Sequence, residues 1–166
     1  MLNFMRLNPW VTVAFASWIL AQTLKLALHA IRTRRMDFSR LVDSGGMPSS
    51  HTAFTVGLST EIGLTEGFRS PEFAVAICFA LVVVYDATNL RRSAGYHAQL
   101  LNEIVPQLLQ GKLLSDKTSF RKLRELLGHS PLEVFVGCLL GALVALLLHG
   151  PLVRNAVPAV VAGLLN

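Results

Sequence analysis

The sequence has few charged residues and few cysteines. Asp, Glu, Lys and Arg make up 15% of its 166 residues, against roughly 25% in an average soluble domain. So few charges argue against a small soluble enzyme, which has a large surface to cover. The 52% of hydrophobic residues excludes a disordered chain. The two cysteines, Cys78 and Cys138, lie alone in apolar runs, which excludes a disulfide framework and a cysteine metal site.

The net charge of +5 does not indicate a nucleic-acid partner, because the chain carries no motif of interleaved basic and aromatic residues. The apolar residues are instead grouped in long runs. A membrane-spanning helix needs about 20 mostly apolar residues, and the stretches that approach this length are Leu7–Ile31, Pro48–Phe68, Pro71–Leu90 and Pro131–His149. The sequence therefore predicts an all-α, polytopic membrane helix bundle with four spanning helices, forming one domain over residues 1–166.

Three of these stretches begin with proline, which suits the first turn of a helix, and Ser70 and Ser130 stand in the N-cap position. The apolar tail 151–166 is short and contains Pro158, so we expect a short fifth helix, either partial or interfacial. The segment Arg91–Leu109 has an amphipathic pattern and is predicted to continue the third span as a cytoplasmic helix, to about Pro106.

The first 30 residues have some features of a signal peptide, but Lys25 and His29 lie where a cleavage region should be small and neutral. We therefore interpret this segment as a retained span. Most lysines and arginines lie in the two polar connections, Arg32–Met47 and Arg91–Ser130. The positive-inside rule places these connections, and any site beside them, on the cytoplasmic face of an integral membrane protein.

Two polar clusters at this face come from the first half of the chain. One is a stripe on a single face of the first helix, formed by Gln22, Lys25, His29 and Arg32. Lys25 either extends its head group to the interface or serves a site. The other is the string Gly45-Gly46-Met47-Pro48-Ser49-Ser50-His51. A helix start of this kind offers free N–H groups to an anion, although a well-capped helix start is the simpler reading.

Two further clusters come from the second half. Asp86 lies in an apolar run and needs a partner, which Arg91 or Arg92 can provide. These arginines can also bind phosphate as a fork, or simply anchor the helix end. His129 and Glu133 are four residues apart, so they share a helix face, where the carboxylate can hold the imidazole in one tautomer. The alternative is an exposed capping histidine.

Together the clusters bring two histidines and several cations to the level of lipid headgroups. Phosphoryl transfer without a metal needs a nucleophile, an acid for the leaving group and cations around the phosphate oxygens. The chain also resembles the superfamily of type 2 phosphatidic acid phosphatases and vanadium haloperoxidases, most closely its small divergent membrane branch. Lys25-x6-Arg32 is similar to its first motif, Pro48-Ser49-Ser50-His51 to its second, and His129-x3-Glu133 to the end of its third.

The resemblance covers about 21–145 and implies roles for these residues. His129 would be the nucleophile, Glu133 would orient it and His51 would protonate the leaving group, while Lys25, Arg32, Ser49 and Ser50 would hold phosphate. Leu123 stands where the third motif has arginine. Arg121 and Arg124 flank it, and Arg91 or Arg92 could substitute for it. Aligning His97 with the third-motif histidine leaves no carboxylate at Leu101, so His129 is preferred.

The resulting hypothesis is a metal-independent membrane phosphatase that acts on a lipid phosphate or pyrophosphate through a phosphohistidine. Phosphatidic acid, phosphatidylglycerol phosphate and polyprenyl phosphates are the candidate substrates, and no cofactor or metal is expected. Asp86 and Gly46 are assigned structural roles beside the site. The alternative is a non-catalytic protein that binds, transports or senses a lipid phosphate in the same pocket. The oligomeric state does not follow from the sequence, and Glu61, in the middle of an apolar stretch, has no evident partner.

Overall fold

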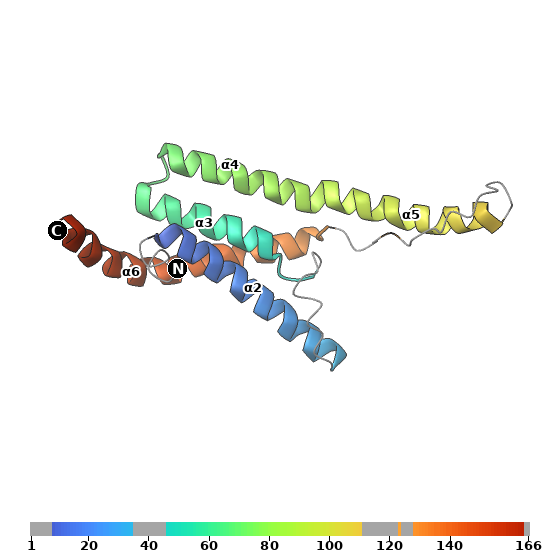
Figure 1. Ribbon diagram of the computed structural model, residues 1–166, viewed down its shortest axis with the longest axis horizontal. Coiled ribbons are helices and arrows are strands. Elements are labelled where there is room, and N and C mark those ends of the chain that lie inside the picture. The colour runs from blue at the N-terminus through green and yellow to red at the C-terminus, as the bar shows by residue number, and fades with distance from the viewer. Residues whose placement is uncertain (1–7, 35–45, 111–122, 124–127, 165–166) are drawn as a thin grey trace.

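The computed structural model describes residues 8–34, 46–110, 123 and 128–164. Every regular element in these ranges is a helix, which confirms the predicted all-α class. In chain order they are α2 (Pro9–Thr33), α3 (Ser50–Glu66), α4 (Pro71–Tyr85), the π-helical turn η2 (Asp86–Leu90), α5 (Arg91–Gln110) and α6 (Pro131–Leu164) (Figure 1).

Three segments of the described chain are long and apolar enough to cross a membrane: Pro9–Thr33, Pro71–Leu108 and Pro131–Gly150. They match the first, third and fourth predicted spans. The second predicted span corresponds to α3, which has only 17 residues. At 1.5 Å per residue it is about 26 Å long, slightly less than the hydrocarbon thickness of about 30 Å. Three spanning helices are therefore supported, and the fourth stays a prediction.

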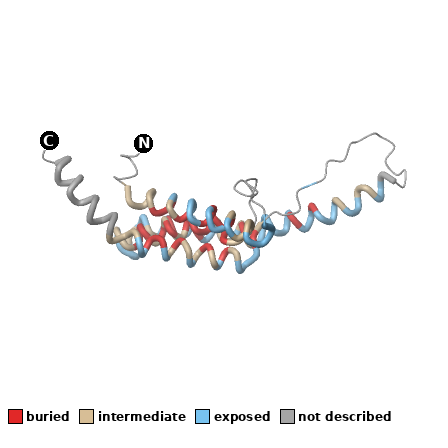
Figure 2. The backbone as a smooth tube through the Cα atoms, turned by 90° about the horizontal axis from the view of Figure 1, so that it is seen from below, coloured by how far each residue is buried: buried red, intermediate tan, exposed pale blue. Residues whose placement is uncertain are grey.

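Helix α3 occupies the centre of the bundle, since it packs against α2, α4 and α6. Its buried side chains are largely polar, and Glu61, Thr52 and Ser59 are among the most deeply buried in the described chain. Figure 2 shows most of the buried residues within the bundle, with a few more along α5. Several hydroxyls bond back to their own helix; that of Thr65, for example, donates to the carbonyl of Glu61. The surrounding helices therefore allow a polar helix to exist at membrane depth.

Glycines on α6 let α3 and α6 approach very closely. A Cβ atom at Gly141 would collide with the carbonyl oxygen of Ala53, and one at Gly137 would lie 2.6 Å from the carbonyl oxygen of Ser49. Small residues four apart are typical of helix contacts in membranes, where close backbone approach supplies the packing energy. This contact fixes the start of α6 against the start of α3.

The third predicted span and the amphipathic segment form one continuous rod, α4–η2–α5, which extends well beyond the bundle (Figure 1). The rod passes Pro106 and ends at Gln110, so the expected end at Pro106 is wrong. The candidate span Pro71–Leu108 has 38 residues, or about 57 Å, which exceeds the thickness of the hydrocarbon core. Part of the rod must therefore lie outside the membrane.

The expected separate fifth helix is also wrong. Helix α6 continues without a break from Pro131 to Leu164 and includes both Pro151 and Pro158. Each proline removes one backbone donor, but the helix can continue when its neighbours keep their helical geometry. The predicted helix starts are confirmed at two positions, since the hydroxyls of Ser70 and Ser130 accept hydrogen bonds from backbone N–H groups three residues later.

Candidate functional site

A cavity of about 220 Å³ lies where α3 begins, α4 ends and α6 begins. Four residues singled out in the sequence line it: His51, Asp86, Arg91 and His129. Apolar side chains of η2 and the end of α4 complete the wall. The fold thus brings residues from three separate regions of the sequence together at one end of the bundle.

His129 is 4% exposed, and its Nδ1 lies 3.0 Å from Oε2 of Glu133. The same carboxylate oxygen accepts the backbone N–H of Ser130 at 3.1 Å, while the Ser130 hydroxyl accepts the N–H of Glu133 at 3.3 Å. This is a capping-box arrangement at the start of α6. Because the carboxylate accepts the Nδ1 proton, the Nε2 lone pair of a neutral His129 stays available for chemistry.

The backbone of His129 is held by the π-helical turn. Its N–H donates to the carbonyl of Ala87 at 3.0 Å. A π-turn changes the regular bonding pattern of the helix, so a carbonyl such as this one can serve another segment. Gly128 has a φ of +89°, and a Cβ atom there would lie 2.5 Å from the backbone nitrogen of Arg92. The sequence did not predict the hydrogen bond to Ala87 or the close approach to Arg92. The glycine at position 128 is a signal that could have indicated the close approach.

The groups around His129 shift its pKa in opposite directions. Burial lowers the pKa of His129 below its ordinary value of 6.5, and the hydrogen bond and negative charge of Glu133 raise it. The positive charges of Lys25 and Arg91 lower the pKa further, and the net change is downward. The imidazole is therefore neutral at neutral pH, which is the form required of a nucleophile.

Lys25 is buried, with 5% of its surface exposed, and its stem lies beneath the turn that precedes α3. Gly46 in that turn has a φ of +101°, and a Cβ atom there would be 3.5 Å from Lys25 Cδ. A residue with a side chain would be strained at this φ. Gly46 thus lets the turn cover the lysine, and the ammonium group influences His129 from this position.

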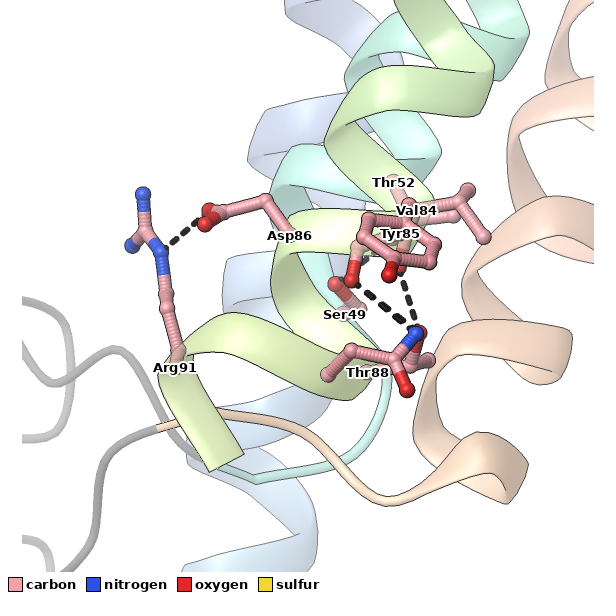
Figure 3. Close-up of polar contacts among 8 residues, drawn as sticks. Ser49, Thr52, Val84, Tyr85, Asp86, Thr88 and Arg91 are labelled. Atoms are coloured by element: carbon pink, nitrogen blue, oxygen red, sulfur yellow. Dashed lines mark hydrogen bonds and ion pairs between the residues drawn. The ribbon is translucent and has the colours of Figure 1, made fainter. Parts of the chain in front are cut away.

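Asp86 has the partner that its position requires. Its Oδ2 accepts Nε of Arg91 at 2.6 Å, and Figure 3 shows the two side chains meeting on one side of the π-helical turn, with Thr88 on the other. The Nε of Arg92 instead donates to the hydroxyl of Tyr96. Arg91 therefore belongs to the cavity, whereas Arg92 and the exposed Arg32 at the end of α2 do not line it.

The two serines before His51 are buried between helices. The backbone N–H of Ser49 donates to the carbonyl of Glu133 at 3.0 Å, and its hydroxyl lies 2.9 Å from that of Thr52. Ser50, the first residue of α3, is 2% exposed. Ser49 thereby ties α3 to the residue that orients His129, a contact that the sequence did not predict.

Leu123, which takes the place of the third-motif arginine, lies beside α5. Its backbone N–H and carbonyl both bond to the side chain of Asn102, at 2.8 and 2.9 Å. Asn102 is roughly three helical turns beyond Arg91. Position 123 is thus displaced from the cavity along the rod, and so is the exposed His97. Arg121 and Arg124 lie outside the described residues.

Glu61 has a partner at the other end of α3. Its Oε1 lies 3.2 Å from Nδ1 of His149 on α6, a pairing that the sequence spacing could not indicate. Within the described ranges, no group of three or more His, Cys, Asp or Glu side chains is placed to hold a metal ion.

The chain is similar to a known family of membrane proteins. A family model described as the divergent PAP2 family matches residues 7–144. An uncharacterized membrane protein, YuiD of Bacillus subtilis (strain 168), is 39% identical over 142 residues, covering 81% of this chain and 90% of that protein. No solved structure matches significantly.

Proposed function

Because the chain belongs to the divergent PAP2 family, we propose that it is a membrane phosphatase that hydrolyses a lipid phosphate or pyrophosphate without a metal. The observation that carries this proposal is the cavity shared by His51 and His129, in which Glu133 fixes the orientation of the His129 imidazole. Because α4 and the start of α6, which border the cavity, belong to segments that can span a membrane, we expect the site to lie near the level of lipid headgroups.

In the first step, the Nε2 lone pair of His129 attacks phosphorus and forms an N–P bond. The bond between phosphorus and the leaving oxygen breaks, and His51, whose protonated form is favoured by the negative charge of the bound phosphate, transfers its proton to that oxygen. The lipid then leaves as an alcohol or, from a pyrophosphate, as a monophosphate. Glu133 stabilises the positive charge that develops on the imidazole of His129. Lys25 and Arg91 stabilise the negative charge on the phosphate oxygens. To do so, Arg91 leaves its ion pair with Asp86 and binds the phosphate of the substrate.

In the second step, neutral His51 accepts a proton from water as the water oxygen attacks the phosphohistidine. The N–P bond breaks, inorganic phosphate leaves and both histidines return to their initial states. The positive-inside rule, applied to the basic connections, supports a cytoplasmic orientation of the site. Labelling of the cysteine in Ser115→Cys tests this orientation. We expect labelling from the cytoplasmic side of the membrane and not from the opposite side, and the reverse result would overturn the orientation.

The proposal is tested by measuring phosphate release from a panel of lipid phosphates by purified protein with a chelator present. We expect release by the wild type and none by His129→Ala, with both proteins showing the same elution profile and helix content. Complete inhibition of the wild type by the chelator would refute the metal-free mechanism. Equal release by His129→Ala would refute the role of His129.

A second candidate function is binding or transport of a lipid phosphate without hydrolysis. It is favoured by the Asp86–Arg91 ion pair, which already occupies the one arginine that lines the cavity among the described residues, and by the position of Leu123 away from it. Saturable binding of a lipid phosphate, without release of phosphate from any member of the panel, would favour this alternative.

A further inference from the structure

A second hollow adjoins the histidine cavity and runs along the outer surface of the bundle. It has a volume of about 370 Å³, and its walls come from α2 and α4 with α3 between them. We call it the aromatic groove, because Phe15, Trp18, Phe54 and Phe79 line it. His51 and Val83 line both the groove and the cavity, so the two spaces meet at His51.

Each of the three helices presents its residues to these spaces in the same order. On α2, Phe15 and Trp18 line the groove, and Lys25, which lines neither space, lies two turns beyond Trp18 toward the site. On α3, Phe54 lies one turn deeper than His51. On α4, Phe79 precedes Asp86 by two turns. The combined surface is apolar at one end and polar and cationic at the other, which is the pattern of an amphiphile with a phosphate head.

The groove faces the lipid rather than water. Its walls belong to two helices that can span the membrane, α2 and α4, and Trp18 and Phe79 on its rim are 37% and 53% exposed. Phe15 and Phe54 are fixed by an edge-to-face contact with ring centroids 5.5 Å apart. An apolar chain lying in the groove can therefore leave sideways into the bilayer while its phosphate stays at His51.

The surface of the groove is almost entirely apolar up to His51. Thr55 does not change this, because its hydroxyl donates to the carbonyls of His51 and Thr52 in its own helix. The ester carbonyls of a glycerophospholipid would thus enter a region that offers them little hydrogen bonding, and burying unpaired polar groups is costly. The volume is near the lower end of about 300–1,000 Å³ for small-molecule pockets, which suits one chain better than two.

Resting on the proposed lipid-phosphate site, we infer that the aromatic groove binds the hydrocarbon chain of a single-chain phosphate, in which the chain begins at the phosphate ester oxygen. A long-chain alkyl or isoprenoid alcohol phosphate has this chemistry. A diacylglycerol phosphate does not, because its glycerol and two esters separate the phosphate from the chains.

Binding is measured by the quenching of Trp18 fluorescence in Trp10→Phe, which leaves Trp18 as the single tryptophan. The probes are a long-chain alkyl phosphate and a phosphatidic acid, each with brominated chains, added to micelles at equal mole fraction. Brominated alcohol without phosphate serves as the control for nonspecific contact with the exposed indole. We expect the alkyl phosphate to quench saturably and above this control, and to be displaced by its unbrominated form.

Phe79→Ala is compared with Phe135→Ala, a matched control whose side chain is 59% exposed on α6 and does not line the groove. We expect the first to weaken alkyl phosphate binding roughly fivefold to tenfold through lost apolar contact, and the second to leave it unchanged. Stronger binding of phosphatidic acid, or equal effects of the two variants, would overturn the inference. If Phe79→Ala does not fold, the preference measured in Trp10→Phe still decides between the two lipids.

The same probes separate this inference from the proposed function. Selective binding of the alkyl phosphate without its hydrolysis would retain the groove and refute the phosphatase. Hydrolysis of phosphatidic acid in preference to the alkyl phosphate, by a protein that loses activity in His129→Ala, would retain the phosphatase and refute the groove assignment.

Discussion

Replacing Glu133 by glutamine removes one negative charge from the site and little else. The Glu133 side chain accepts bonds from His129 Nδ1 and from the backbone of Ser130, at 3.0 and 3.1 Å. Glutamine is accepted at this position of a capping box, so the start of α6 should persist. The change should therefore act on the imidazole of His129 and leave the fold intact.

The expected loss of rate follows from the hydrogen bond that is weakened. A hydrogen bond to a charged group contributes about 1.5–3 kcal/mol, and its contribution grows as positive charge develops on His129 in the transition state. We therefore expect kcat to fall roughly 10- to 100-fold in Glu133→Gln. His129→Ala should lose more, because it removes the nucleophile itself.

The pH profile provides the sharper test. The bond and charge of Glu133 raise the pKa of His129, so removing the charge should lower that pKa further. Since the neutral imidazole is the active form, the acidic limb of kcat/KM should move to lower pH while the maximum falls. A limb that moves to higher pH, or an unchanged kcat, would refute the reasoning. Ser130→Ala, which weakens the same cap without changing the charge, should leave the limb in place.

Three further predictions test the site and its support. His51→Ala should slow hydrolysis strongly for an alkyl phosphate and much less for a substrate with an acidic phenol as leaving group; equal losses would contradict its role as the acid. Gly141→Ala should lower the stability of the detergent-solubilised protein by about 1–3 kcal/mol, because its Cβ would meet the carbonyl of Ala53; an unchanged melting temperature would contradict the close packing. His149→Leu should destabilise the protein more than the double change with Glu61→Leu, since the single change leaves a buried carboxyl without this partner; additive effects would contradict the coupling.

Much of this arrangement could be predicted because membrane helices have a strong local signal. Long apolar runs and proline or serine at helix starts located α2, α4 and α6. The spacing of His129 and Glu133 predicted their contact correctly. The physical reason is different from the one expected, because His129 precedes the N-cap Ser130 and the capping box, rather than a shared helix face, brings the Glu133 carboxylate to it. Asp86 was expected to need a basic partner, and it has Arg91.

Other features depend on contacts between distant segments, which no local pattern reports. The shielding of the polar helix α3 by three neighbours and the pairing of Glu61 with His149 arise only when the helices pack together. The π-helical turn that offers the carbonyl of Ala87 to His129 has no evident sequence signature. The continuity of α6 through two prolines is likewise not evident from helix propensity.

The placement of phosphate ligands was predictable only in part. Motif spacing gave Arg32, Ser49 and Arg92 alike as candidate phosphate ligands, but none of their side chains lines the cavity in the folded chain. Ser49 joins α3 to α6, and Arg92 contacts Tyr96. Side chains on neighbouring positions of a helix point in different directions, so adjacency in sequence does not place two arginines in one cavity.

The central claim is that His129 carries the phosphoryl group. Rapid quenching of the wild-type protein during turnover of a radiolabelled lipid phosphate tests it most directly, with the label followed to its peptide. The account predicts a labelled protein that is stable to alkali and labile to acid, as a phosphohistidine is, with the label on His129 and absent from His129→Ala. Turnover without a labelled protein intermediate, or label on a different residue, would contradict it.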